Sequence, residues 1–142
     1  MLVSRDSPRL PSASGKSMTP ISPTRFEAFV GGYMGPSYAV RLEAGEVVYE
    51  RFTEGYELAE HVRITPAPQA WAAFLAVVDH FDVWSWQRSY SPVDAVVDGT
   101  MWSLTLEGTT RRIEARGANA YPNDFEEWCR AVSELVRGRE FR

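Results

Sequence analysis

The chain of 142 residues has only one cysteine, Cys129. A single thiol cannot form an internal disulfide, and zinc sites usually take three or four nitrogen or sulfur ligands at fixed spacing. We therefore expect neither a disulfide framework nor a bound metal or other cofactor. The lack of a disulfide fits a reducing compartment, and we expect a cytoplasmic protein.

Long hydrophobic runs are also missing. The longest, "AWAAFLAVV", is far shorter than the ~18 apolar residues that a membrane-spanning helix needs. Residues 1–17 contain no apolar segment of the kind that a secretory signal carries behind its charges. We expect no secretory signal and no membrane partner.

Positive charge is scarce as well, with 15 Lys and Arg against 19 Asp and Glu and a formal net charge of −4. Arg5, Arg9 and Lys16 against Asp6 give residues 1–17 a charge of +2, which leaves −6 for the remainder. Proteins that bind nucleic-acid phosphates have a stripe of Lys and Arg side chains on their surface. We therefore expect no nucleic-acid partner.

Histidine is limited to His61 and His80, and no Gly-x-Ser-x-Gly segment is present, which weighs against a Ser-His-Asp hydrolase. His61 falls on the polar side of a predicted strand, and His80 falls near the end of a predicted helix. Asp94 and Asp98 are the acids in a loop-like setting, as a pair of catalytic carboxylates requires. A small hydrolase or transferase of unrecognised type, using these acids or a histidine in a cleft, therefore stays open.

The chain divides into a tail and one domain. Residues 1–24 are rich in Ser and Pro without an apolar period, so we expect a flexible tail before a single domain at 25–142. Met18 begins a shorter reading frame, and the sequence leaves open whether translation starts at Met1 or Met18.

A first β-hairpin is predicted over residues 37–52. Apolar and polar residues alternate on both sides of Ala44-Gly45, a two-residue turn signal that sets Glu43 opposite Glu46. Shorter alternating segments at 25–30 and 60–64 add two strand candidates. The hairpin side chains expected to face the core are Tyr38, Val40, Leu42, Val47 and Tyr49.

A second hairpin is predicted over residues 100–116, with its turn at Glu107-Gly108. Pairing Leu106 with Thr109 across that turn places Trp102 opposite Ile113. The side chains expected to share the core face are Trp102, Leu104, Leu106, Ile113 and Ala115.

Two amphipathic helices complete the pattern. Thr65 is predicted to cap the first, with Pro66 as its first residue, and Asn123 or Asp124 to cap the second, which Gly138 ends. The apolar stripes are Trp71, Phe74, Leu75, Val78 and Phe81 in the first helix, and Phe125, Trp128, Cys129, Val132, Leu135 and Val136 in the second.

These elements together predict an α+β fold of two layers. We expect a mostly antiparallel sheet of about six strands with two helices packed on one face, built as β-hairpins followed by a helix, twice.

Aromatic residues are abundant, at 13% of the chain. Several fall outside the predicted core, and Trp84, Trp86, Arg88 and Tyr90 share one face if that segment is extended. Trp, Tyr and Arg are enriched at the energetic centres of protein interfaces, so we predict a binding surface from these four residues and Tyr121. The alternative is that they close one end of the core.

This surface leads to a hypothesis for function. We expect a non-enzymatic protein-interaction or binding module, a small acidic protein whose partner is another protein or a second copy of the chain. A homodimer through a free sheet edge or the aromatic face is compatible with this hypothesis.

The segments "GPSYAVRLEAGEVVYERF", "DGTMWSLTLEG" and "GANAYPNDFEEW" resemble a group of small bacterial α+β domains of unknown function. The resemblance covers residues 26–136 and follows a hairpin, a helix, a second hairpin and a final helix. The group has no assigned catalytic residue, so the resemblance implies a fold and no site.

Overall fold

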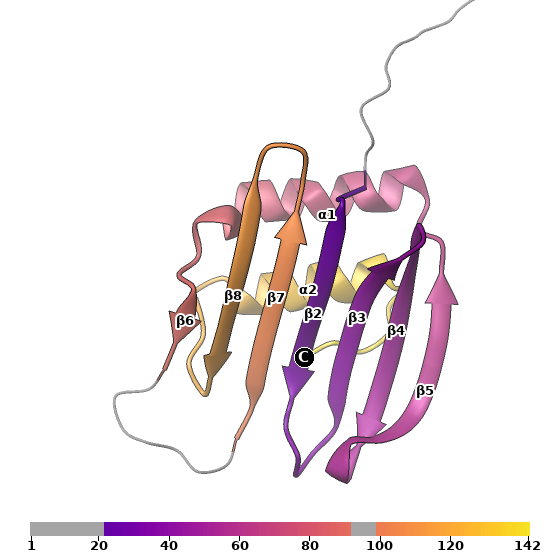
Figure 1. Cartoon of the computed structure of the whole chain (residues 1–142), viewed down its shortest axis with the longest axis vertical. Helices are drawn as coiled ribbons and strands as arrows, with labels where there is room; N and C mark the ends of the chain where they lie inside the picture. The colour runs from indigo at the N-terminus through magenta and orange to yellow at the C-terminus, as the bar shows by residue number, and fades with distance from the viewer. Residues whose placement is uncertain (1–21, 92–98) are drawn as a thin grey trace, which may run out of the picture.

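The computed structural model describes residues 22–91 and 99–142, which form one open sheet of seven strands with helices on one face. The spatial order of the strands is β5-β4-β3-β2-β7-β8-β6 (Figure 1). Neighbouring strands are antiparallel except β6 and β8, which are parallel. The strands are β2 (Arg25–Gly31), β3 (Ser37–Glu43), β4 (Glu46–Thr53), β5 (Glu57–Ile64), β6 (Ser89–Tyr90), β7 (Met101–Glu107) and β8 (Arg112–Ala118).

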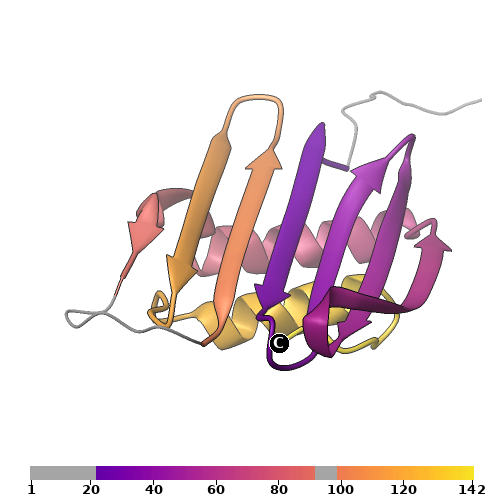
Figure 2. The ribbon, with the colours of Figure 1, turned by 60° about the horizontal axis from the view of Figure 1, so that its bottom comes forward.

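Two α-helices, α1 (Pro68–His80) and α2 (Phe125–Leu135), lie against the same face of the sheet. Figure 2 shows both helices beneath the strands and the opposite face of the sheet uncovered. Two short 3-10 helices, η1 (Glu54–Tyr56) and η2 (Val83–Ser85), join β4 to β5 and follow α1. The predicted α+β class, with an antiparallel sheet and two helices on one side, is confirmed.

The core lies between the sheet and the helices, and aromatic rings fill much of it. Phe26 of β2 packs against Trp71, Phe74 and Trp128, with ring centroids 5.2–6.2 Å apart. These four rings join β2 to both helices, and edge-on or tilted pairs of this kind add about 0.5–1.5 kcal/mol each beyond their burial.

The first hairpin has the predicted register, with Glu43 opposite Glu46 and Val40 opposite Tyr49. Its turn residues Ala44 and Gly45 both have positive φ, as the two-residue turns that match strand twist require. Val48, on the side expected to be polar, is fully buried instead.

The second hairpin has a different register from the predicted one. Leu106 pairs with Ile113, and Trp102 pairs with Gly117, because the loop takes four residues, 108–111, rather than two. The Gly108 N–H donates to the Arg111 carbonyl at 2.8 Å and closes that loop. The partner strand is shifted by an even number of residues, so the predicted core face is retained.

The helix starts also differ from the predicted ones. The first helix begins at Pro68 after Ala67, and Thr65 and Pro66 lie before it, outside any helix or strand. Pro68 tolerates this position because the first helical N–H has no partner within the helix. Asp124 is the capping residue of α2, as one of the two predicted alternatives, but its side chain accepts no capping hydrogen bond.

The sheet has seven strands rather than about six, because residues 89–90 form a short edge strand beside β8. Asp94 and Asp98 lie outside the described residues, as does most of the predicted tail at 1–24. In the described part of the chain, neither helix has the length and apolar character needed to cross a bilayer.

Candidate functional site

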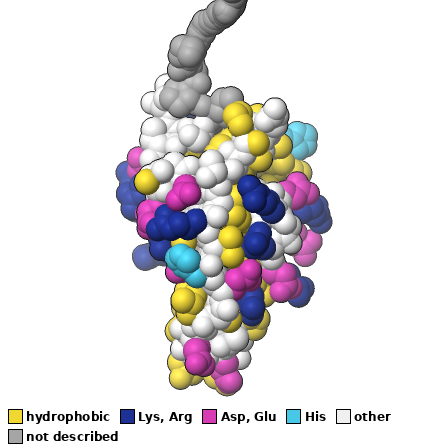
Figure 3. Space-filling view, turned by 90° about the vertical axis from the view of Figure 1, so that its right-hand side faces the viewer, with side chains coloured by type: hydrophobic (Ala, Val, Ile, Leu, Met, Phe, Trp, Pro, Cys, Tyr) yellow, Lys and Arg dark blue, Asp and Glu magenta, His cyan; other side chains and the backbone are white. Residues whose placement is uncertain are grey.

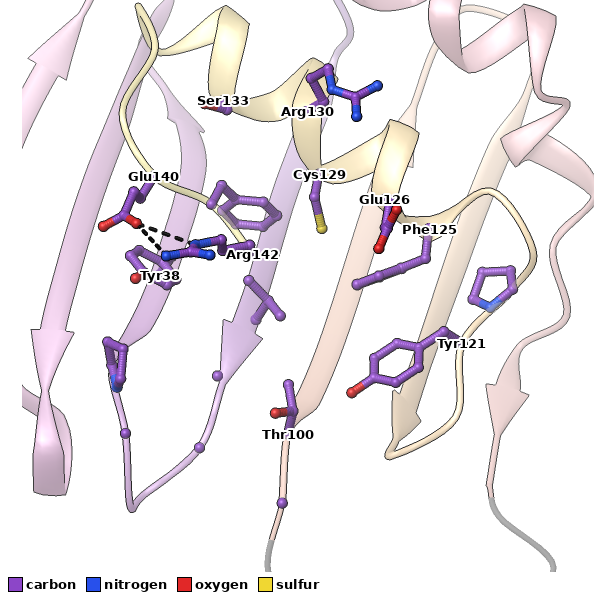
Figure 4. A pocket seen from close by; sticks show the side chains of 18 of the residues that line it. Tyr38, Thr100, Tyr121, Phe125, Glu126, Cys129, Arg130, Ser133, Glu140 and Arg142 are labelled. Atoms are coloured by element: carbon purple, nitrogen blue, oxygen red, sulfur yellow. Dashed lines mark hydrogen bonds and ion pairs between the residues drawn. The ribbon is translucent and has the colours of Figure 1, made fainter.

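A groove of about 1160 Å³ lies where the ends of β2 and β7 meet α2 and the last residues of the chain (Figure 4). Three segments far apart in sequence line it, at residues 30–38, 99–100 and 121–142. No single stretch of sequence carries this arrangement, so sequence analysis did not find it.

The floor of the groove is apolar and well packed. Its side chains are less than a tenth exposed, and they come from β2, β3, α2 and the C-terminal segment: Val30, Tyr38, Phe125, Cys129 and Phe141. Hydrogen bonds fix the C-terminal segment beside this floor, from the Tyr49 hydroxyl to the Glu140 carbonyl at 2.8 Å and from Ser133 Oγ to the Arg139 carbonyl at 2.6 Å. The floor is therefore rigid.

Glycine backbone forms much of the rim, since five of the ten glycines in the chain line the groove: Gly31, Gly32, Gly35, Gly99 and Gly138. Gly31 is required by packing, because a Cβ there would overlap Ser37. Gly35 is different, since a Cβ there would meet no atom within 4 Å and its φ is not positive. The fold itself gives no reason for glycine at position 35.

Among the described residues, four charged side chains line the groove, and two of them form a pair. Arg142 binds Glu140 at 2.8 Å, and among the side chains drawn in Figure 4 the dashed lines join only these two. Glu126 hangs below α2 beside Phe125, whereas Arg130 extends along the helix. The Tyr121 ring reaches into the groove and stacks at a tilt on Phe125, with centroids 5.0 Å apart.

The Cys129 thiol points into the groove but is not a nucleophile. Burial, and after it the nearby Glu126 carboxylate, raise the pKa of Cys129 to about 12, so the thiol is protonated at neutral pH. Burial, and after it Glu140, also raise the pKa of the Tyr38 hydroxyl.

Neither histidine lies in the groove. The His61 Nδ1 is 2.9 Å from a Glu50 carboxylate oxygen on the uncovered face of the sheet, and His80 stacks edge-on against Phe81 at the end of α1. Within residues 22–91 and 99–142, no three His, Cys, Asp or Glu side chains gather as metal ligands do.

Four of the five predicted binding residues, Trp84, Trp86, Arg88 and Tyr90, lie in the segment that follows α1 and make different contacts. The segment after α1 is a 3-10 helix at 83–85 rather than an extended strand, and Trp86 turns inward. Its ring packs against Trp102, Phe125 and Trp128 with centroids 5.9–6.3 Å apart. Tyr90 packs on Trp102 in the same way, at 5.6 Å.

Trp84 and Arg88 lie apart from that group. The Trp84 indole N–H donates to Asp79 at 2.8 Å, and the Arg111 guanidinium stacks over its ring at 4.7 Å. Arg88 is mostly exposed and lies 3.6 Å from Glu114. Of the five residues, Tyr121 is the one that lines the groove. Whether Trp84, Trp86, Arg88 and Tyr90 bind a partner stays a prediction.

A second aromatic group lies on the uncovered face of the sheet. Tyr33 and Tyr56 pack edge-on at 5.8 Å, Tyr56 packs on Phe29 at 6.5 Å, and Met101 points outward from the adjacent strand. We call Phe29, Tyr33, Tyr56 and Met101 the free-face cluster. Tyr33 is 62% exposed, so this cluster places aromatic side chains at the molecular surface.

The rest of the uncovered face carries a network of ion pairs. Arg41 donates to Glu43 and Glu50, each at 2.8 Å, and Arg63 donates to Glu43 at 2.6 Å. The hydrogen bonds from Arg41 and Arg63 hold the pKa of Glu43 below its usual value. Figure 3, which faces the β5 edge of the sheet, shows basic and acidic side chains interspersed there.

A comparison with protein-family models finds no match, and no curated protein matches the sequence. The resemblance to small bacterial α+β domains therefore stays an expectation.

Proposed function

We propose that this chain is a non-enzymatic binding module that accepts an extended segment of a partner protein in the groove. The observation that carries the proposal is the composition of the groove, which combines a rigid apolar floor with a rim of glycine backbone and a few polar side chains. Ligand sites in proteins are mostly apolar with few, well-placed polar groups.

The size and rim of the groove favour a peptide over a small molecule. Pockets that bind small ligands have volumes of ~300–1000 Å³. The volume of this open groove, about 1160 Å³, is above that range. Gly99 and Gly138 at the rim are exposed and have no side chain to shield their backbone, and extended peptides bind through backbone N–H and C=O groups. Gly35 supports this reading because the fold does not need glycine there.

The chemistry of the groove favours binding over catalysis. Its thiol is protonated, and both histidines lie elsewhere in the described part of the chain. The enzyme hypothesis based on Asp94 and Asp98 concerns residues outside the described ranges.

Selection of peptides from a random library on the full chain tests the proposal. Gly35→Trp places a large ring in the open space at the rim, at a position whose φ is not positive, and should abolish binding of the selected peptides while leaving the fold intact. Ala73→Trp, on the exposed side of α1, adds the same ring away from the groove and should bind them as the parent does. Peptides that bind Gly35→Trp and the parent equally would refute the groove as their site.

A further inference from the structure

We propose that the groove recognises a basic side chain, Lys or Arg, on the bound segment, with the cation held between the Glu126 carboxylate and the Tyr121–Phe125 ring pair. This inference rests on the proposed function and names the chemistry of its ligand.

The first support is the charge left over in the groove. Glu140 and Arg142 form an ion pair at 2.8 Å, so neither side chain needs an oppositely charged group on the ligand. Arg130 is one helical turn beyond Glu126 yet extends along α2, while the Glu126 carboxylate hangs toward the floor (Figure 4). Outside the Glu140–Arg142 pair, the carboxylate drawn toward the floor of the groove is that of Glu126.

The second support is that the Glu126 charge acts on the floor. Its carboxylate is the one charged group that contributes, after burial, to the raised pKa of Cys129. Opposite charges attract, so a cation placed in the groove beside this carboxylate gains from it.

The third support is the ring pair beside the carboxylate. Tyr121 is 43% exposed, and its ring packs against Phe125 at 5.0 Å with an angle of 44° between the planes. A guanidinium or ammonium group over an aromatic face gains from the ring quadrupole, and a neighbouring carboxylate adds a charged hydrogen bond. Residues 121–126 thus provide both kinds of contact for one cation.

The charge of the whole chain acts in the same direction. Residues 18–142 carry a formal charge of −6, and a negative molecule attracts cationic segments during encounter. The same negative charge would repel an acidic partner segment.

The test is titration of the ¹⁵N-labelled full chain with the tripeptide acetyl-Gly-Arg-Gly-amide, followed by amide shifts. We expect saturable shifts centred on Tyr121, Glu126 and Cys129. The same peptide with citrulline, which keeps the shape of arginine and lacks its charge, should bind about tenfold more weakly, as loss of one charged hydrogen bond predicts.

Two variants on α2 sharpen the test. Both positions are exposed, so neither substitution should disturb the fold. Glu126→Gln should weaken the arginine peptide about tenfold and leave the citrulline peptide unchanged. Glu134→Gln, the matched control, makes the same change of charge on the same helix outside the groove lining and should bind the arginine peptide as the parent does.

The outcomes separate this inference from the proposed function. If both the arginine and the citrulline peptide shift the amides of the groove and bind with equal affinity, the cation site is wrong. The proposal that the groove binds a peptide would then still hold. An unchanged affinity in Glu126→Gln would overturn the cation site as well. If methylguanidinium binds as tightly as the tripeptide, the peptide backbone contributes nothing to affinity and the site is one for a free cation. That result would contradict a peptide ligand and therefore the proposed function.

Discussion

Substitution of Trp86 tests most directly whether this aromatic side chain belongs to the core or to a binding surface. Its ring contacts Trp102, Phe125 and Trp128, and the ring is half-buried. Trp→Ala at a fully buried site costs about 3–5 kcal/mol, and three ring pairs alone contribute at least ~1.5 kcal/mol. Trp86→Ala should therefore lower the free energy of unfolding by about 2–3 kcal/mol.

Trp84→Ala is the matched control from the same segment. It removes a hydrogen bond to Asp79 and the stacking of Arg111, which together are worth about 1 kcal/mol at a half-exposed site. The assay is equilibrium urea unfolding followed by far-ultraviolet circular dichroism, with the slope against urea expected to stay unchanged.

A loss below ~1 kcal/mol for Trp86→Ala, or a loss no larger than that of Trp84→Ala, would refute this reasoning. Trp86 would then act as a surface residue, and the aromatic surface predicted from the sequence at Trp84–Tyr90 would become the stronger binding site.

Three further predictions follow from the same contacts. With its pKa raised from 9.0 to about 12, Cys129 should react with iodoacetamide at pH 8 about 1000-fold more slowly in the native than in the urea-unfolded chain, and equal rates would contradict a buried thiol. Burial raises the pKa of Cys129 from 9.0 to about 12 and that of Tyr49 from 10.0 to about 12, so the folded state keeps both groups neutral over a wider pH range than the unfolded state does. The free energy of unfolding should therefore fall between pH 9 and 12 through Cys129 and between pH 10 and 12 through Tyr49, by up to ~1.4 kcal/mol per pH unit for each group. Unfolding free energies at pH 8 and 11 measure this loss, and Tyr49→Phe should reduce it while costing about 1 kcal/mol at pH 8 through the lost bond to Glu140. Gly31→Ala should destabilise the chain by more than ~1 kcal/mol because of its positive φ and its contact with Ser37, whereas Gly35→Ala should change stability by less than that, and thermal unfolding of the two variants compares them directly.

The fold was predictable where local chemistry decides the structure. Ala44-Gly45 specified both the turn and the register of the first hairpin, because its two residues adopt the positive φ that such a turn needs. At Gly108 the same reasoning failed, since that glycine has no positive φ and the loop closes through Arg111 instead. The core face survived this error because side chains alternate with a period of two.

The candidate site was not predictable in the same way. Tyr121 was identified from its loop position, but its neighbours in the groove come from β2, β3, α2 and the C-terminal segment, which only the tertiary structure brings together. Trp86 was predicted to lie on a binding surface if its segment was extended, with closure of one end of the core as the alternative. Asp82 instead turns the chain with a φ of 51°, and the following 3-10 helix directs the Trp86 ring into the core.

The central claim is that the groove holds a peptide, and intermolecular nuclear Overhauser effects test it most directly. A ¹³C-labelled peptide selected on the full chain would be bound to the unlabelled protein. We predict contacts from the peptide to the rings of Tyr121, Phe125 and Phe141, which line the groove. Contacts to Tyr33 and Tyr56 of the free-face cluster, without any to the groove rings, would contradict the account.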